Sequence, residues 1–228
     1  MKKALRVVSI IFLSLILVLF IGYISLNESI PKGTPSPEAD ELARKVEQAM
    51  NKAAWDITSQ VSWTFKGGHQ YVWDKEAHVV NVQWDENEVI LEPSSQSGVV
   101  INGENYSAAE SAALIDTAWD LFNNDSFWLC APYKLFDPGT ERSLVTLKDG
   151  REGLMVTYTS GGSTPGDSYI WILDENYMPT AIKMWVSILP IGGMEFTWEN
   201  YQTLATGAMV AQDHFLFGRV NIDISDLE

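Results

Sequence analysis

The sequence is poor in the residues that make covalent cross-links and transition-metal sites. Its 228 residues include one cysteine, Cys130, and three histidines. A single cysteine excludes an intramolecular disulfide framework and any metal site built from several thiolates. The three histidines leave little material for a histidine-rich centre. We therefore expect neither a metal nor any other cofactor.

Basic residues are also scarce. The chain carries 15 Lys and Arg against 30 Asp and Glu, which gives a formal net charge of −15. Binding to nucleic acid phosphates needs clustered Lys and Arg, so no nucleic-acid partner is expected. The charge is unevenly distributed, because residues 1–36 hold four basic side chains and one carboxylate while the remainder has a net charge of −18. The acidity therefore indicates a solvated surface beyond a basic end, and not an acidic active site.

Residues 7–26 carry no charge at all and are mostly apolar. A helix of this length spans about 30 Å, the thickness of the apolar core of a bilayer. Lys2, Lys3 and Arg6 precede the run and favour a cytoplasmic N-terminus. Residues 1–27 are therefore predicted to form an uncleaved, single-pass signal anchor in the cell membrane, with the body in the periplasm. The alternative is a cleaved signal peptide and a soluble periplasmic body, although the run is long for a signal peptide and lacks a small-residue cleavage site.

The rest of the chain is predicted to consist of a short linker and one domain. Residues 28–36 contain two prolines and a glycine without apolar periodicity, so this linker is expected to be extended and exposed. Residues 37–228 show no internal boundary. At the start of this domain, Ser36 as N-cap and Pro37 as first helical residue predict an amphipathic helix of about 20 residues that ends near Thr58.

A second helix is predicted to begin at residue 107. Ser107 and Glu110 have the spacing of a capping box, in which each side chain bonds the backbone of the other residue. The Asn-Asn-Asp sequence at residues 123–125 is expected to stop this helix. The following apolar run around Pro132 fits neither the helical nor the strand period.

The remaining segments alternate between apolar and polar residues with a period of two. Residues 61–101 are predicted to form five short strands in an antiparallel meander, followed by a hairpin turn at Asn102-Gly103. Residues 142–224 are predicted to form about six more strands. The expected fold class is α+β and mostly antiparallel β, with about 11 strands packed on two long helices.

The sequence contains no catalytic arrangement that stands out. The short motifs of α/β-hydrolases, zinc peptidases and phosphate-binding loops are absent. Cys130 lies in an apolar run, which favours a buried and inert thiol over a nucleophile. His69 and His78 begin adjacent strands, but antiparallel pairing separates them and argues against a shared metal. The prediction is a protein that is not an enzyme, without catalytic or metal-binding residues.

Aromatic residues are the most informative part of the composition. The chain has nine Trp, eight Tyr, nine Phe and seven Met, and many of the aromatic residues share one face of their strand. This pattern is explained equally well by a packed core and by a cavity for a non-specific apolar ligand, since flat aromatic and adaptable Met side chains suit both. The candidate ligand-binding residues are Trp63, Phe65, Trp73, Trp119, Phe122, Trp128, Trp171, Met184, Phe196 and Trp198.

The order of elements and two stretches of sequence resemble the LolA-like superfamily of periplasmic lipoprotein and lipid carriers. Residues 61–65 (VSWTF) look like the opening strand of that superfamily, and residues 167–174 (DSYIWILD) look like one strand of its central hairpin. The resemblance implies a curved antiparallel half-barrel over internal helices, and covers roughly residues 37–228. Its members bind acyl chains of lipids or lipoproteins.

Three further stretches are similar to an uncharacterised bacterial branch of that superfamily. They are residues 125–129 (DSFWL), 132–135 (PYKL) and 137–139 (DPG). One difference from the carriers matters for function. The carriers are released as soluble proteins, whereas this chain is predicted to be tethered through residues 7–26 and could not shuttle freely between membranes.

Three hypotheses for the function follow from the sequence. The first is a membrane-tethered, exported, non-catalytic binding protein with an apolar cavity for acyl chains, lipid or lipoprotein anchors. The second is a structural or interaction protein of the cell envelope, with a solid core and a protein partner bound at an exposed sheet edge. The third is a hydrolase that uses Asp and Glu as acid and base.

Overall fold

The computed structural model describes the backbone of residues 2–101, 106–160 and 164–228, and the side chains in these ranges from residue 11 onward, except at position 19. The predicted hairpin turn at Asn102-Gly103 lies outside the described residues. The helical elements are α1 (Lys2–Leu26), α2 (Pro37–Ala49), α3 (Lys52–Ile57), α4 (Ala108–Cys130) and a 3₁₀ helix, η2 (Ala131–Tyr133).

The described strands form one antiparallel sheet that does not close into a barrel. In spatial order they run β5-β4-β3-β2-β1-β13-β12-β10-β9-β8-β7-β6, with β11 paired to β12. The strands are β1 (Gln60–Phe65), β2 (His69–Asp74), β3 (Val79–Trp84), β4 (Asn87–Glu92), β5 (Ser97–Val100), β6 (Thr140–Thr146), β7 (Glu152–Tyr158), β8 (Ser168–Leu173), β9 (Pro179–Trp185), β10 (Met194–Thr197), β11 (Glu199–Thr203), β12 (Met209–Leu216) and β13 (Val220–Ser225).

The α+β class, the antiparallel sheet and the five-strand meander are confirmed, but the strand number is 13 and not about 11. The difference arises in the last part of the chain. The alternation around Trp198 belongs to two strands, β10 and β11, and two more strands follow instead of one. The pairing of β1 with β13 then joins the meander to the rest of the sheet.

The first predicted helix is divided into α2 and α3. Ser36 caps α2 as expected, since its side-chain oxygen accepts a hydrogen bond from the backbone N–H of Ala39 at 3.2 Å. The helix is interrupted at Asn51, which has a left-handed backbone with φ of 59°. Asparagine adopts this conformation more readily than most residues, and its side chain donates to the Gly207 carbonyl at 3.0 Å. The prediction of one continuous helix to Thr58 is therefore wrong.

The second predicted helix continues past its expected stop. The capping box of Ser107 and Glu110 is confirmed, but α4 runs through residues 123–125 and ends only at Cys130. The low helix propensity of Asn and Asp is outweighed here, because Asp125 is buried and bonded to the sheet.

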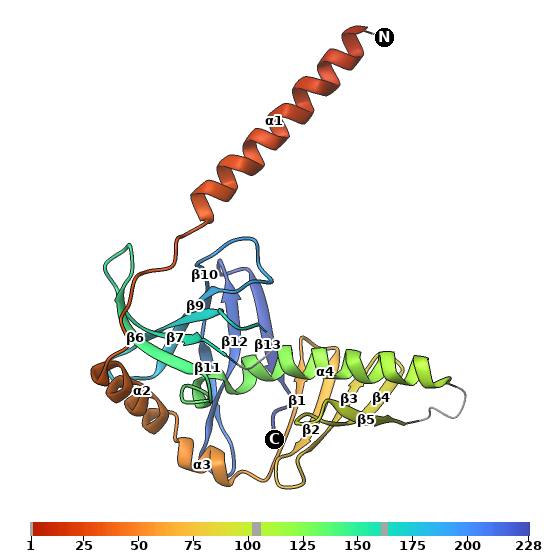
Figure 1. Cartoon of the computed structure of the whole chain (residues 1–228), viewed down its shortest axis with the longest axis vertical. Coiled ribbons are helices and arrows are strands. Elements are labelled where there is room, and N and C mark those ends of the chain that lie inside the picture. The colour runs from red at the N-terminus through yellow and green to blue at the C-terminus, as the bar shows by residue number, and fades with distance from the viewer. Residues whose placement is uncertain (1, 102–105, 161–163) are drawn as a thin grey trace.

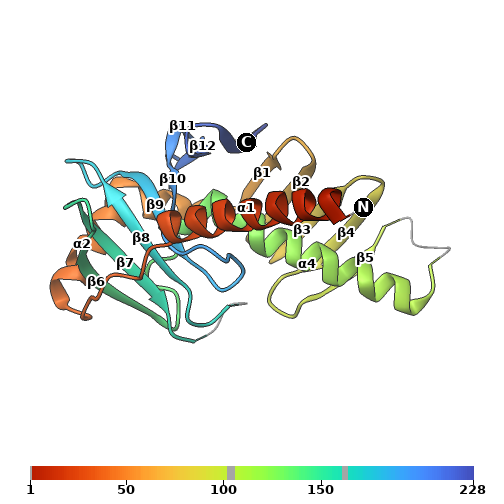
Figure 2. The ribbon, with the colours of Figure 1, turned by 90° about the horizontal axis from the view of Figure 1, so that it is seen from above.

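Figures 1 and 2 show how the helices are arranged on the sheet. The C-terminal part of α4 lies near the middle of the molecule, and the rest of the helix extends along β1–β5. α4 contacts β3, β4, β5, β12 and β13, while α2 contacts β6 and β7. We call the sheet face under α2 and α4 the inner face. The main hydrophobic core lies there.

A smaller core lies on the opposite, outer face of β6–β9. It contains Val145, Met155 and Ile170, with Trp185 packed against it. Residues 27–36, which we call the strap, cross this outer face. A Cβ atom on Gly33 would lie 2.6 Å from the Ser143 Cβ and 2.9 Å from the Val145 Cγ1, so the backbone of the strap is in close contact with the sheet.

Most residues of the strap are exposed, as the sequence predicted. The sequence did not predict that both ends of the strap are also bonded to the body of the protein. Pro35 forms an isolated β-bridge with Ser143 on β6. Glu28 donates its backbone N–H to the Gly192 carbonyl at 2.9 Å and accepts the Trp185 Nε1–H at 2.8 Å.

The helical prediction for residues 7–26 is confirmed by α1. In the described part of the chain, no helix combines the length and the apolarity that crossing a membrane requires.

Candidate functional site

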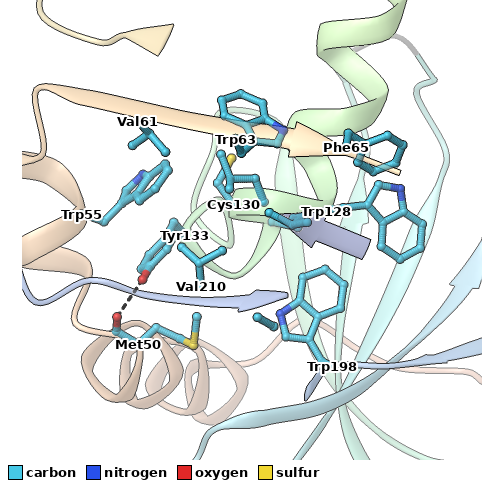
Figure 3. Close-up of a cluster of buried hydrophobic side chains, with 14 of the residues drawn as sticks. Met50, Trp55, Val61, Trp63, Phe65, Trp128, Cys130, Tyr133, Trp198 and Val210 are labelled. Atoms are coloured by element: carbon cyan, nitrogen blue, oxygen red, sulfur yellow. Dashed lines mark hydrogen bonds between the residues drawn. The ribbon is translucent and has the colours of Figure 1, made fainter. Parts of the chain in front are cut away.

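The structure brings all ten candidate ligand-binding residues into or against the main core on the inner face. Eight of them are at most 7% exposed, and the other two, Trp73 and Trp119, are half-buried. Figure 3 shows part of this core, where Trp63, Trp128 and Trp198 gather with Cys130 between the sheet and the end of α4. The one-face pattern of the sequence therefore marks a continuous aromatic core.

The centre of the core is a chain of aromatic rings. Trp128 of α4 lies 4.9 Å from Phe196 and 5.9 Å from Trp198, between ring centroids. Trp171 meets Trp198 edge-on at 5.0 Å. His214 of β12 lies 3.9 Å from Trp198 and 5.3 Å from Trp128. Ring pairs at such separations contribute about 0.5–1.5 kcal/mol each beyond their buried area.

A second aromatic group ties α3, η2 and β12 together. The rings of Trp55 and Tyr133 stack at 4.7 Å with an interplanar angle of 3°. The Tyr133 hydroxyl lies 2.8 Å from the Met50 carbonyl, as drawn in Figure 3, and 2.7 Å from the Met209 carbonyl, so its proton has two acceptors within reach. It also accepts the backbone N–H of Met209 at 2.8 Å. The buried hydroxyl therefore both donates and accepts.

Cys130 behaves as the sequence indicated. It is buried at the end of α4, and its thiol donates to the Ser126 carbonyl at 3.1 Å. Burial raises the pKa of the thiol to about 11. A protonated thiol is a poor nucleophile, so this residue packs in the core.

Three nitrogens of the aromatic core lack a hydrogen-bond partner among the described residues: Trp63 Nε1, His214 Nδ1 and His214 Nε2. His214 is fully buried. Burial lowers the pKa of its imidazole to about 4, although the nearby backbones of Thr197 and Trp128 and the charge of Asp213 oppose the shift. A polar group that stays unpaired in the interior costs about 1–3 kcal/mol, so a water molecule or a ligand atom that bonds these nitrogens would be stabilised there.

A polar cluster fixes α4 to β2 at the border of this core. The buried Asp125 carboxyl accepts the Tyr71 hydroxyl at 2.6 Å and bonds His69 Nδ1 at 2.7 Å, both through Oδ2. Asn124 donates to the other oxygen at 2.8 Å. Burial and the adjacent Asp125 raise the pKa of Tyr71, so the phenol keeps the proton that it donates. The sequence had suggested a helix stop at Asp125 and not this attachment.

A small pocket opens between the end of α4 and strands β7 and β8. It is lined by Phe127, Tyr158, Tyr169 and Trp171, among others, and its volume is about 10 Å³. That volume holds about one water molecule, whereas small-molecule sites usually measure about 300–1,000 Å³. An acyl chain would therefore fit only if α4 moved away from the sheet.

Sequence reasoning missed several residues of this region. His214 was not among the candidate residues, although the alternation from Val210 to His214 would have placed it on the inner face. Phe127 was missed because it fell beyond the expected helix stop. Trp55 was missed as well, and it lies in α3, after the interruption at Asn51 that the sequence did not predict. Within the residues whose placement is described, no group of three or more His, Cys, Asp or Glu side chains could hold a metal ion.

No family model matches the chain, and no curated protein matches it. Among solved structures, the crystal structure of a DUF1329 family protein from Desulfovibrio piger is similar, with 11% sequence identity and a TM-score of 0.38. The match covers 85% of this chain and 92% of that chain. The predicted LolA-like membership is not confirmed by these comparisons.

Proposed function

We propose that the protein is a non-catalytic, membrane-tethered binding protein of the cell envelope that accepts the acyl chain of an amphiphile between α4 and the inner face of the sheet. The observation that carries this proposal is the set of unsatisfied nitrogens on Trp63 and His214 inside an otherwise apolar core. The indole N–H is a donor, and a neutral imidazole offers one donor and one acceptor. An ester or carboxyl group beside an acyl chain supplies the matching acceptors.

The tether part of the proposal rests on the apolar run at residues 7–26. Most described side chains of α1 are apolar and exposed, including Phe12 at 61%, Leu17 at 57% and Ile24 at 59%. A helix that is apolar all round needs an apolar environment. Lipid supplies it, and the basic residues before the run favour a cytoplasmic N-terminus with the body on the other side of the membrane.

The ligand part requires the interior to open. The first two-thirds of α4 offer a route, because most of their residues are exposed or half-buried, whereas the last part is buried. Displacing the helix would uncover the rings of Trp128 and Phe122. An acyl chain bound there would contact these rings in place of α4. Each CH₂ group of the chain that is buried would stabilise the complex by about 0.8 kcal/mol.

We expect native mass spectrometry of the full chain, extracted from its membrane in detergent, to show a bound acylated molecule in stoichiometric amount. The matched variants are His214→Phe, which removes two of the three unsatisfied nitrogens, and Val72→Ala on the exposed face of β2. Val72→Ala should keep the added mass and His214→Phe should lose most of it. If the wild-type protein is folded and its spectrum shows only the mass of the protein chain, the ligand proposal is wrong.

A second candidate function is favoured by one specific observation. β5 pairs with β4 on one side, and no described strand pairs with its other side. The opposite end of the sheet differs, since Pro35 of the strap bridges to β6. Together with the filled core, the open edge fits a protein partner that adds a strand to β5.

A substitution at the open edge of β5 tests this second function. Ile101 donates its backbone N–H to the Glu88 carbonyl on the β4 side, so the N–H of the preceding residue, Val100, points to the open side of β5. A Val100→Pro change removes that donor from the edge. If a partner strand adds there, chemical cross-linking of the full chain in its native membrane should lose that partner in Val100→Pro and keep it in Val100→Thr. Equal cross-linking in both variants would exclude this edge as the binding surface.

A further inference from the structure

Exposed apolar side chains gather at the end of the sheet from which α1 leaves. Ile188 is 70% exposed in the connection between β9 and β10, and Phe217 is 64% exposed in the hairpin between β12 and β13. Val220, beside that hairpin, is 54% exposed. We call Ile188, Phe217 and Val220 the tip surface. Apolar side chains of this size at loop tips indicate contact with something other than water.

Strand register places the two loops at the same end of the sheet. Phe196 of β10 lies opposite Leu216 of β12, so the start of β10 lies beside the hairpin that follows Leu216. The connection from β9 ends at that start. In Figure 1 both loops point to the side of the body from which α1 emerges.

The two loops also lack the acidity of the rest of the chain. Residues 186–193 carry no charged side chain, and residues 216–222 carry only Arg219, in a chain with 30 acidic residues. The turn at the far end of β8 and β9 differs, since it contains Asp174 and Glu175. Apolar loops next to a basic residue suit the headgroup region of a bilayer, where carboxylates would be repelled by anionic lipid.

The strap holds the end of α1 against the first of these loops. Beyond the bonds of the Glu28 backbone to Gly192 and Trp185, the Glu28 carboxylate pairs with the Lys183 ammonium at 2.8 Å. The Asn27 side chain accepts the Gly192 N–H at 2.8 Å. Only Asn27 separates Leu26, the last residue of α1, from Glu28, a reach of about 7 Å. The loop that carries Ile188 therefore cannot move far from the end of α1.

We propose that the tip surface rests in the headgroup region of the membrane that α1 enters, with Arg219 directed at lipid phosphate. The inference rests on the proposed membrane tether and adds the orientation of the body. The sheet then stands with its β9–β10 and β12–β13 loops on the lipid, and the small pocket beside β7 and β8 lies toward the same end. An acyl chain could pass from the bilayer to the inner face without crossing open water.

The test uses the full chain reconstituted in phosphatidylcholine vesicles with and without phosphatidylglycerol. An environment-sensitive fluorophore is attached in turn to Ile188→Cys, Phe217→Cys and the control Val99→Cys. Val99 is as exposed as Phe217, at 64%, but lies on β5. The native Cys130 is buried and should not react under folding conditions.

We expect the fluorophores at 188 and 217 to shift to the blue and to lose emission when shallow doxyl-labelled lipids are added, while the fluorophore at 99 does neither. Water-like emission at all three sites, in chains that float with the vesicles, would overturn the orientation and leave the tether standing. A blue shift without lipid quenching would show a protein contact at the tips and overturn the inference as well. Chains that do not float would overturn the tether and, with it, the orientation.

Discussion

Lowering the pH from 7 to 4 is expected to remove about 3 kcal/mol of the free energy of unfolding through His214 alone. The side chain is fully buried, and burial lowers its pKa from the ordinary 6.5 to about 4. Asp213 on the same strand opposes the shift but does not cancel it. The folded protein therefore resists a proton that the unfolded chain takes up readily.

The direction of this pH dependence follows from the pKa of His214 in the unfolded chain and its pKa in the folded protein. Well above pH 6.5 the imidazole is neutral in both states, and His214 contributes almost nothing to the pH dependence. Between pH 6.5 and about 4 the unfolded chain binds a proton and the folded chain does not, so stability falls as the pH falls. The slope approaches about 1.4 kcal/mol per pH unit in this window. Below about pH 4 this contribution levels off.

Urea unfolding at a series of pH values, compared between wild type and His214→Phe, isolates the contribution. Carboxylates elsewhere titrate in both proteins, so the difference between the two curves belongs to His214. The variant should be at least as stable as wild type at pH 7, because it removes two unsatisfied nitrogens, and clearly more stable at pH 4.5. Parallel curves over the whole range would show that the imidazole finds a partner that keeps its pKa ordinary.

The same variant separates function from packing. If His214 serves only the core, His214→Phe leaves any bound amphiphile in place. If it serves the ligand, the variant gains stability and loses the ligand. A residue retained at the expense of stability is expected where binding, and not folding, determines the side chain.

Local sequence patterns predicted much of the fold. The alternation from Val61 to Phe65 predicted β1 and its buried face, and the Ser107 capping box fixed the start of α4. Both depend on neighbouring residues alone. The end of α4 depends instead on Tyr71 and His69, more than fifty residues earlier in the chain, and no local rule anticipates that bond. The expected stop at residues 123–125 was wrong for this reason.

The candidate site also depends on contacts that local sequence patterns do not predict. The parity of Trp63, Trp171 and Trp198 placed them correctly on one face, but parity says nothing about how much space the face encloses. The volume left inside depends on how closely α4 approaches the sheet, which is a property of the whole packing. The strap is a further case, since the Pro and Gly residues that correctly indicated an exposed linker gave no sign that its backbone lies close against Ser143 and Gly192.

Asp125→Ala is expected to lower the free energy of unfolding by about 2–4 kcal/mol, because the Tyr71 hydroxyl and the His69 imidazole lose their shared acceptor. Tyr71→Phe should cost less, about 1–2 kcal/mol, since Asp125 keeps its bonds to His69 and Asn124. Urea unfolding of the two variants and their double mutant measures the coupling, which should be positive for groups in direct contact.

The region that loses stability in Asp125→Ala tests the role of the polar cluster around Asp125. Asp125 joins α4 to β2, so hydrogen exchange in Asp125→Ala should accelerate in α4 and in β1–β4 while the amides of β7–β9 stay protected. If a ligand enters the aromatic core by displacing α4, the same variant should take up a fluorescent fatty acid faster than wild type. Uniform acceleration across the sheet would contradict a local attachment. Local acceleration with unchanged uptake would keep the attachment and exclude entry by displacement of the part of α4 that Asp125 holds.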